Sequence, residues 1–323
     1  MTAAVAAALL AGGLAACGSS DSETYQIAIT QYLAHPSLDA ITQGFKDALA
    51  DKGVEVEYTY DDAQGEQANT ATIAGKYAAD GDLDLIVAVA TPSAQAVVAQ
   101  ERDRPVLYAG VTDPVAAGLV PAWEASGTNV SGTSDLNPEG KPAALIEEIM
   151  GKGNVKTIGY LYSLGEKNSE VQLDALRAEA EALGMEVKES GIANSSELVA
   201  GAQALADVDV IFVGTDNTVV TGLEQVVAFG QENQIPLFVA DAASVERGAV
   251  ATRGIDYYQL GVRTGEMAYE ILVEGKKAGD IPSLQVTDTQ VVANPEAAEA
   301  FGLTIPAAIL EGAEVVTTAA SSG

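Results

Sequence analysis

The sequence repeats one pattern of short apolar runs and amphipathic stretches in its two halves. In the first half, strand-like runs alternate with helical periodicity at Ile27–Thr30, Leu38–Lys52, Val54–Tyr60, Asn69–Ala79 and Leu85–Ala90. One constant spacing links matching positions of the second half, which pair Ile27 with Ile158, Gly53 with Gly184, and Pro105 with Pro236. Asp84–Val87 corresponds to Asp209–Phe212 once a single gap is allowed. This duplication predicts two similar units, each a mostly parallel sheet covered by helices.

The chain has 323 residues, of which 48% are hydrophobic, which is enough for two such lobes. We therefore expect an α/β fold of two similar doubly wound parallel-sheet lobes. A helical stretch at Leu260–Glu274 and a strand at Gln285–Val292 follow the second copy and should cross back to form a multi-stranded hinge. The expected division is 25–131 plus 257–285 for lobe 1, 132–256 plus 286–316 for lobe 2, and a disordered tail at 317–323. Open parallel sheets bind ligands beyond the carboxyl ends of their strands, so the lobes should face each other across a cleft.

Residues 1–16 form an apolar run that is too short to span a membrane and is typical of a secretory signal. Leu14–Cys17 resembles the lipobox of bacterial lipoproteins, in which the signal is removed before a lipid-bearing cysteine. Residues 17–24 would then form a tether. No Lys or Arg precedes Lys46, which leaves open whether translation starts upstream of Met1. A buried or reactive thiol is the alternative for Cys17, and as the only cysteine it excludes a disulfide within the chain.

The formal charge is −30, from 16 Lys and Arg against 46 Asp and Glu. Phosphate binding depends on basic patches, so this charge argues against nucleic acid as a partner. Solubility is the simplest account of the acidity.

The stretch "VAVATPSAQAVV" (87–98) predicts a buried strand followed directly by a helix. Thr91 suits the N-cap and Pro92 the first helical position, which leaves the amides of Ser93 and Ala94 unpaired and suited to an anion. An ordinary capped turn is the alternative interpretation. The second half repeats the device in "FVGTDNTV" (212–219), where Thr215 and Asp216 follow a strand, and this repetition favours a binding role.

Five motifs resemble one known family: "ITQYLAHPSLDAITQGFKDAL", "VAVATPSAQ", "GVTDPVAAGLV", "GTDNTVV" and "GIDYYQLG". They are similar to those of substrate-binding lipoproteins of ABC transporters with the type I periplasmic-binding fold, in the subfamily that binds tryptophan, tyrosine or phenylalanine. The resemblance runs from about Tyr25 to about Pro306. It implies a receptor that closes on an amino acid and delivers it to a membrane permease powered by an ATPase.

A free amino acid needs separate partners for its carboxylate and its ammonium group. We expect the carboxylate to meet the hydroxyls of Thr91 and Ser93, the amides of Ser93 and Ala94, and Thr112 at the next strand end; the resemblance implies the same placement on lobe 1. Candidates for the ammonium are acidic and polar residues at strand ends of lobe 2, with Asp241 ahead of Asp216 and Asn217. Asp216 has the alternative role of a helix-start acid, and Asp113 that of a turn residue.

Aromatic and polar groups at other strand ends are candidates for contact with the ligand's side chain. These are Gln31, Tyr32 and Tyr162, whereas Tyr108 and Tyr160 are expected in the core. Asn168 and Ser169 start a helix and serve either as N-caps or as ligand contacts. His35, the only histidine, should cap a helix or line the cleft, because one histidine without Cys or His neighbours makes a poor metal site. No metal or other cofactor is expected.

An enzyme is the main competing class, but the chain lacks a G-x-S-x-G elbow, a P-loop and a G-x-G-x-x-G after the first strand. A sensory receptor domain or a ligand-presenting accessory protein is the other alternative. The sequence as a whole favours an exported, lipid-anchored, monomeric binding protein on the extracytoplasmic face of the membrane.

Overall fold

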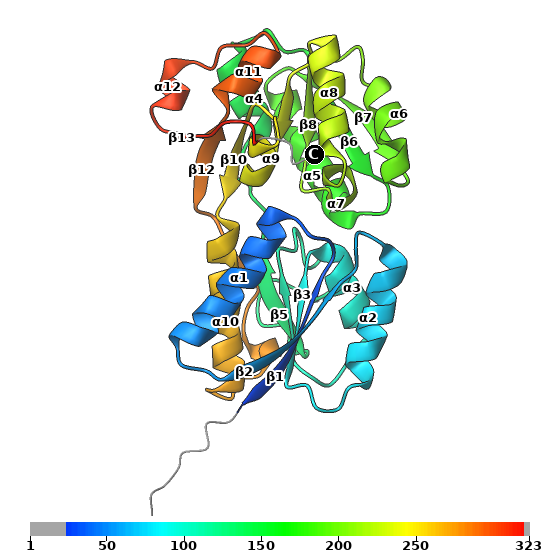
Figure 1. The fold of residues 1–323 in the computed structure, drawn as a ribbon, viewed down its shortest axis with the longest axis vertical. Helices are drawn as coiled ribbons and strands as arrows, with labels where there is room; N and C mark the ends of the chain where they lie inside the picture. Colours follow the sequence, from blue (N-terminus) through cyan, green and yellow to red (C-terminus); the bar gives the residue numbers. More distant parts are fainter. Residues whose placement is uncertain (1–23, 320–323) are drawn as a thin grey trace, which may run out of the picture.

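The structure, a computed structural model, describes residues 24–319. They form two α/β lobes stacked along the long axis, with lobe 1 drawn below lobe 2 in Figure 1. The predicted signal, Cys17 and all of the tether except Thr24 lie outside the described residues. Within residues 24–319, no helix combines the length and the apolar character that a membrane span requires.

Lobe 1 is built on one parallel six-stranded sheet of order β11-β5-β4-β3-β1-β2. Its strands are β1 (Tyr25–Gln31), β2 (Val56–Asp62), β3 (Leu85–Val89), β4 (Val106–Ala109), β5 (Val130–Ser134) and β11 (Leu284–Gln285). Its helices are α1 (Pro36–Asp51), α2 (Gln67–Ala79), α3 (Thr91–Gln100) and α10 (Tyr257–Leu272). The α1–α10 pair lies on one side of the sheet and the α2–α3 pair on the other (Figure 1).

Lobe 2 has a parallel sheet of order β7-β6-β8-β9 beside a smaller sheet of order β10-β12-β13. Its strands are β6 (Thr157–Ser163), β7 (Glu186–Ile192), β8 (Val210–Val213), β9 (Leu237–Val239), β10 (Ala251–Ile255), β12 (Thr289–Ala293) and β13 (Glu314–Val315). Its helices are α4 (Pro142–Met150), α5 (Lys167–Ala182), α6 (Leu198–Gln203), α7 (Asn217–Val220), α8 (Leu223–Asn233), α9 (Ala242–Glu246), α11 (Pro295–Ala300) and α12 (Ala307–Leu310). The order β7-β6-β8-β9 repeats β2-β1-β3-β4 of lobe 1, which confirms the duplication.

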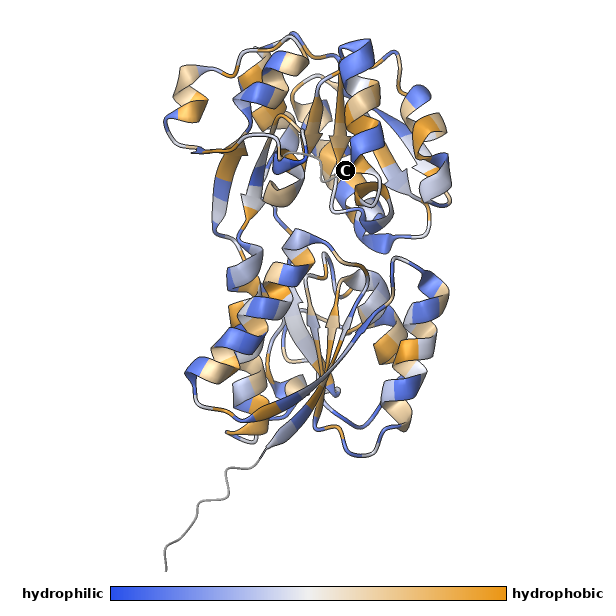
Figure 2. Cartoon of the chain, in the orientation of Figure 1, coloured by the Kyte–Doolittle hydropathy of each residue, from blue (hydrophilic) through white to orange (hydrophobic). Residues whose placement is uncertain are grey.

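Each lobe has its own apolar core around fully buried strands. The central strand β3 is buried along its whole length, and the strands in Figure 2 are correspondingly rich in hydrophobic colour while the helices mix both colours. In lobe 1 the α1–α10 contact depends on glycine. A Cβ atom at Gly44 would lie 2.2 Å from the carbonyl oxygen of Tyr258, and one at Gly261 would lie 2.1 Å from that of Ile41. The absence of side chains at these positions therefore lets the two helix backbones approach closely.

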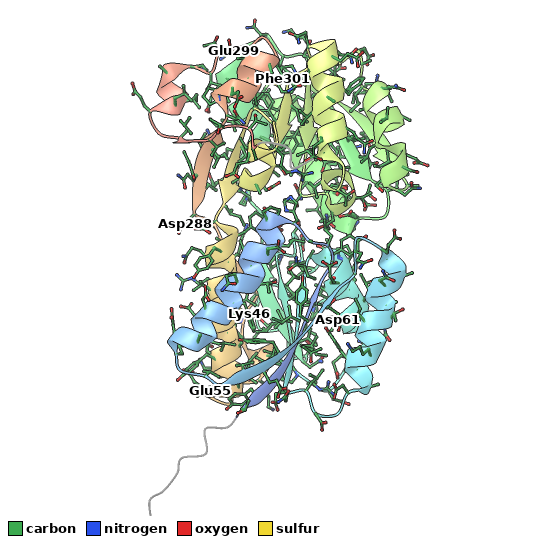
Figure 3. All side chains as sticks on the ribbon, viewed as in Figure 1. Lys46, Glu55, Asp61, Asp288, Glu299 and Phe301 are labelled. Carbon is green, nitrogen blue, oxygen red and sulfur yellow. The ribbon has the colours of Figure 1, made fainter. Side chains whose placement is uncertain are left out.

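The chain passes between the lobes three times: after β5, between β10 and α10, and between β11 and β12. Figure 3 labels Asp288 in the third connection. Lobe 1 therefore includes β5 as far as Ser134, beyond the expected boundary at 131. The predicted strand Gln285–Val292 is wrong as a single element, because β11 pairs in lobe 1 and β12 in lobe 2.

The segment 317–319 is also ordered by hydrogen bonds, contrary to the predicted disordered tail. The Thr318 amide donates to Glu296 Oε2 (3.1 Å) and the Ala319 amide donates to the carbonyl oxygen of Glu246 (2.8 Å). The remainder of the predicted tail, 320–323, lies outside the described residues.

Candidate functional site

A small polar pocket lies between the lobes at the carboxyl ends of the strands. It has a volume of about 30 Å³. Lobe 1 contributes His35, Ser37, Leu38, Ala90, Thr91, Gly110, Thr112, Asp135 and Tyr257, and lobe 2 contributes Asn168, Thr215, Asp216, Asn217, Val220 and Asp241. Thr91 and Asp241, the principal candidates of the two halves, thus share one pocket. This polar pocket is the candidate ligand site.

The start of α3 differs from the sequence-based expectation by one residue. Ala90, not Thr91, is the N-cap; its φ of 74° and ψ of 155° lie in a region that alanine rarely adopts. The helix therefore begins at Thr91, and the Ala94 amide donates to the Ala90 carbonyl oxygen (3.1 Å) instead of remaining free. The prediction for Ala94 is wrong for this reason. The amides of Thr91 and Ser93 find no acceptor among the described residues, and no side chain caps α3.

The matching helix of lobe 2, α7, is capped by Asp216. Its Oδ1 accepts from the Val219 amide (2.8 Å), and its Oδ2 accepts from the Ser163 amide and the Ser169 hydroxyl (2.6 Å each). Asp216 is fully buried, and burial, followed by the nearby charge of Glu166, raises the pKa of its carboxyl to about 7. Asp216 thus has the helix-start role that its sequence position suggested, while it also lines the polar pocket.

Glu166 is a second buried carboxylate on this side, and its sequence position gave no hint of its role. Its Oε2 accepts from the Asn168 side chain (2.9 Å) and from the amide and side chain of Asn217 (2.9 and 2.6 Å). Its Oε1 accepts from the amide and hydroxyl of Thr218 (2.8 Å each). Five donors make this carboxylate a rigid support for the lobe 2 wall of the pocket.

Asp241 caps α9 and also links the lobes. Its Oδ1 accepts from the Ser244 amide (3.0 Å) and, across the cleft, from the Ser37 hydroxyl (2.9 Å). Its Oδ2 has no donor among the described residues. The carboxylate is 3% exposed and lines the polar pocket, so this second oxygen is available to a ligand.

Two polar atoms of the pocket are buried without a hydrogen-bond partner: His35 Nε2 and Asn168 Oδ1. His35 Nδ1 accepts from the Ser37 amide (3.3 Å), and burial lowers the pKa of the imidazole, so Nε2 carries the hydrogen of a neutral ring. Asn168 Nδ2 donates to Glu166 and to the Thr215 carbonyl oxygen (2.8 Å), which fixes Oδ1 as the free acceptor. The site therefore presents one buried side-chain donor and one buried side-chain acceptor without partners, in addition to the free Thr91 amide and Asp241 Oδ2.

Asp135, at the end of β5, is a pocket residue that the sequence analysis missed. It accepts from the Thr112 hydroxyl (2.9 Å) at Oδ1 and from the Tyr257 hydroxyl (3.2 Å) at Oδ2, and burial raises the pKa of its carboxyl. Asp135 and Tyr257 each stand beside a connection between the lobes. The strand-end rule that selected Asp241 would have found Asp135 if β5 had been recognised.

An apolar cavity of about 570 Å³ adjoins the polar pocket, with which it shares Thr112, Asp135, Thr215 and Tyr257. It extends into lobe 2, where its walls include Leu145, Val171, Leu176, Phe212 and Phe238. Two cations lie on its lining, Lys141 and Arg253, and they pair with Glu139 (3.2 Å) and Glu148 (2.9 Å).

Several candidates do not line the polar pocket. Gln31 is fully buried, and its side chain forms hydrogen bonds with Leu33, Asp39 and Thr42 within lobe 1. Asp113 caps the amides at 115 and 116, which is the turn role. Tyr162 donates to Glu189 on the surface of lobe 2 (3.3 Å).

Five further residues also lie outside the pocket lining: Ser93, Tyr32, Ser169, Tyr108 and Tyr160. Tyr108 and Tyr160 are fully buried, as expected. Among residues 24–319, no group of three or more His, Cys, Asp or Glu side chains could hold a metal ion.

Comparison with known proteins identifies relatives over almost the whole described chain. Residues 26–317 match the family described as ABC transporter substrate binding protein. A protein of Clostridioides difficile (strain R20291) named tyrosine-binding protein is 40% identical over 282 residues, which cover 86% of this chain and 81% of that protein. A crystal structure from Streptococcus pneumonia, an ABC domain in complex with L-Trp, is 36% identical with a TM-score of 0.86, covering 91% of this chain and 100% of that one.

A further solved structure relates to the arrangement of the lobes. The ligand-free, open structure of a substrate-binding protein from Clostridium difficile is 40% identical over 91% of this chain and 100% of that one, but its TM-score is only 0.69. The structure is thus more similar to the L-Trp complex than to this open relative, although the sequence identity is lower. The bond between Ser37 and Asp241 agrees with a closed arrangement of the lobes.

Proposed function

This chain belongs to the ABC transporter substrate binding protein family and has the two-lobed type I periplasmic-binding fold, and on that premise we propose that its ligand is a free aromatic amino acid. The ligand is held between the lobes, which close over it, and is then delivered to a permease and its ATPase. The protein acts as a receptor and not as an enzyme.

The observation that carries the proposal is the opposition of donors and acids across one pocket. Lobe 1 offers the free amide and the hydroxyl of Thr91 at an uncapped helix start and the Nε2–H of His35, which suit a carboxylate. Lobe 2 offers Asp241 Oδ2 and Asn168 Oδ1, which suit an ammonium group. The capped start of α7 supports this division, because there a carboxylate of the protein itself occupies the position that is free on α3.

The adjoining apolar cavity supports an aromatic side chain on the same ligand. Phe212 and Phe238 offer ring surfaces, and aromatic rings gain free energy from both burial and ring contact. The names of the relatives point in the same direction, since one is called a tyrosine-binding protein and another was crystallised with L-Trp.

Attachment to the membrane is part of the proposal. We infer from Leu14–Cys17 that the mature protein is anchored through a lipid on Cys17 and faces the outside of the membrane. Mass spectrometry of the membrane fraction would detect the lipid, and a soluble, unmodified Cys17 would contradict it.

Isothermal titration of the purified protein with L-Tyr, L-Trp, L-Phe, L-Leu and L-Glu tests the proposed ligand. Aromatic amino acids should bind most tightly. Thr91→Val should weaken binding by about 1–3 kcal/mol, because one hydroxyl is lost while the helix amides remain. Asp241→Asn should weaken it by about 2–5 kcal/mol, because an ammonium loses a buried charge partner while the cap of α9 keeps an oxygen acceptor.

Ser37→Ala is the matched control for Asp241→Asn. It removes the bond across the cleft but leaves the Asp241 carboxylate in place, so it should weaken binding less than Asp241→Asn does. Equal losses in the two variants would mean that Asp241 acts only through that bond. The absence of binding for all three aromatic amino acids would refute the proposed ligand.

A further inference from the structure

We propose that the ammonium group is the indispensable part of the ligand, so that the site also takes aromatic primary amines without a carboxylate and rejects aromatic acids without an amine. This inference rests on the proposed function and deepens it, because it ranks the two polar groups of the ligand. It follows from the composition of the polar pocket: its acidic groups come from both lobes and have no basic partner in the lining, whereas the donors that suit a carboxylate are neutral dipoles.

The titratable groups that line the pocket, apart from the neutral His35, are all acids. Asp135, Asp216 and Asp241 line it, and Glu166 lies directly behind Asn168 and Asn217. No Lys or Arg is among the lining residues of the polar pocket. Arg247, whose charge reaches His35, is held by both carboxylate oxygens of Glu224 (2.7 and 2.8 Å).

An unmatched acceptor accompanies these acids. Asn168 is 4% exposed and its Oδ1 has no hydrogen-bond partner, while both hydrogens of its Nδ2 are used. Turning the amide over would place Oδ1 against the Glu166 carboxylate and the Thr215 carbonyl oxygen, so the observed orientation is enforced. A ligand N–H would satisfy Asn168 Oδ1. An ammonium group supplies this N–H together with a positive charge, which no Lys or Arg of the pocket lining provides.

The donors that would meet the carboxylate are neutral groups. The Thr91 amide, the Thr91 hydroxyl and the neutral His35 ring are dipoles, not cations. If a ligand lacks the carboxylate, these groups lose a partner, but water can replace it, because one water molecule needs only about 10–15 Å³. The loss is then that of hydrogen bonds from neutral donors to the carboxylate, with no ion pair broken.

Removing the ammonium has a larger cost. An aromatic acid would bring a further negative charge, without a compensating ammonium, into a closed pocket that already holds buried acidic groups, and Asn168 Oδ1 would stay unmatched. Burial raises the pKa of the Asp135 and Asp216 carboxyls, the negative charge of Glu166 adds to the shift at Asp216, and no Lys or Arg in the pocket lining offsets this charge. A ligand ammonium would neutralise it.

Three compounds that share one indole ring test the ranking by isothermal titration at pH 7.5: L-tryptophan, tryptamine and indole-3-propionate. Tryptamine should bind about 10- to 100-fold more weakly than L-tryptophan, as expected for the loss of hydrogen bonds from neutral donors to a carboxylate. Indole-3-propionate should bind more weakly than tryptamine by at least a further factor of about ten. Tyrosine, tyramine and 3-(4-hydroxyphenyl)propionate form the matched series if tyrosine is the tighter amino acid.

Two variants connect the ranking to its residues. Thr91→Val should weaken L-tryptophan more than tryptamine, because only the amino acid has a carboxylate to lose. Asp241→Asn should weaken both by similar factors, because both carry the ammonium. If Thr91→Val only distorted the site, it would weaken L-tryptophan and tryptamine by the same factor. If Asp241→Asn only distorted the site, it would weaken indole-3-propionate as much as it weakens the two ammonium ligands.

The possible failures are distinguishable. If an aromatic amino acid binds and its deaminated acid binds as tightly as its amine, the inference is overturned while the proposed function stands. If the amine binds and no amino acid does, the proposed ligand is wrong and the preference for an ammonium is supported. If no compound of either series binds, both are refuted.

Discussion

Ala90 determines how the donor side of the site is presented. Its positive φ places the start of α3 one residue before the position that Thr91 and Pro92 predict, so Thr91, a pocket residue, lies in the first turn with an unused amide. No sequence rule anticipates this conformation for alanine, because glycine is the residue that adopts it readily. The role of Thr91 in the pocket was nevertheless predictable, since it depends on the strand end and not on the cap.

Acidic residues show where sequence reasoning reaches its limit. Asp216 and Asp241 were both expected at strand ends, and both prove to be helix caps and pocket residues together. A carboxylate that caps a helix can use one oxygen for the cap and leave the other free, and only the structure shows which oxygen is free. Glu166 and Asn168 lie two residues apart in the sequence, but their hydrogen bond and the free Oδ1 of Asn168 are equally invisible there.

Asp216 should make the stability of the protein depend on pH. Its carboxyl has a pKa of about 7 in the folded state against an ordinary value of 3.8, because it is buried and lies near Glu166. The folded protein therefore holds a proton that the unfolded chain releases between these values, so the free energy of unfolding should fall as the pH rises from about 4 through 7.

Thermal unfolding of the wild type and of Asp216→Asn across pH 5–8 checks this expectation. The variant cannot ionise there, so its melting temperature should fall less steeply, and titrations shared by both proteins cancel in the difference between their slopes. Parallel curves would show that Asp216 is ionised in the folded protein throughout this range.

At the scale of elements, the alternation of strands and helices and its duplication were readable because buried strands such as β3 are continuous apolar runs. Short or polar strands could not be recognised in this way. β5 has the sequence VSGTS, which contains one large apolar residue, and Asp135 was missed with it. β11 and β12 merged into one predicted strand because hydrophobicity does not record a change of sheet.

The α1–α10 contact gives a prediction at this scale. Gly261→Ala should destabilise the protein by about 1–3 kcal/mol, since its new Cβ would overlap the Ile41 carbonyl oxygen and push the helices apart. Gly81→Ala is the control, because a Cβ there would contact nothing within 4 Å. Urea unfolding of both variants measures the difference, and equal midpoints would mean that the helices can shift without cost.

For the whole molecule, the like charges of the pocket oppose closure until a ligand neutralises them. Asp135 belongs to lobe 1, and Asp216 and Asp241 belong to lobe 2, so closing the lobes brings these carboxylates together. Without ligand, the open arrangement should therefore be favoured in solution, and a ligand that contacts both lobes should shift the population toward closure.

Small-angle X-ray scattering with and without a saturating aromatic amino acid checks this shift. The radius of gyration should decrease when the ligand is added and should stay constant with L-Glu, whose side chain is acidic and not aromatic. An unchanged radius with a ligand that titration shows to be bound would mean that the lobes are already closed without it.

The three passages between the lobes have a consequence for how the protein can be divided. Because α10 returns to pack on α1 only after the chain has passed through β6 to β10 of lobe 2, a fragment that ends at residue 134 lacks the partner for one face of its sheet. No single cut in the backbone separates one complete lobe from the other. A truncated gene product, or a nick in one connection, would therefore yield an incomplete core and not an autonomous half-receptor.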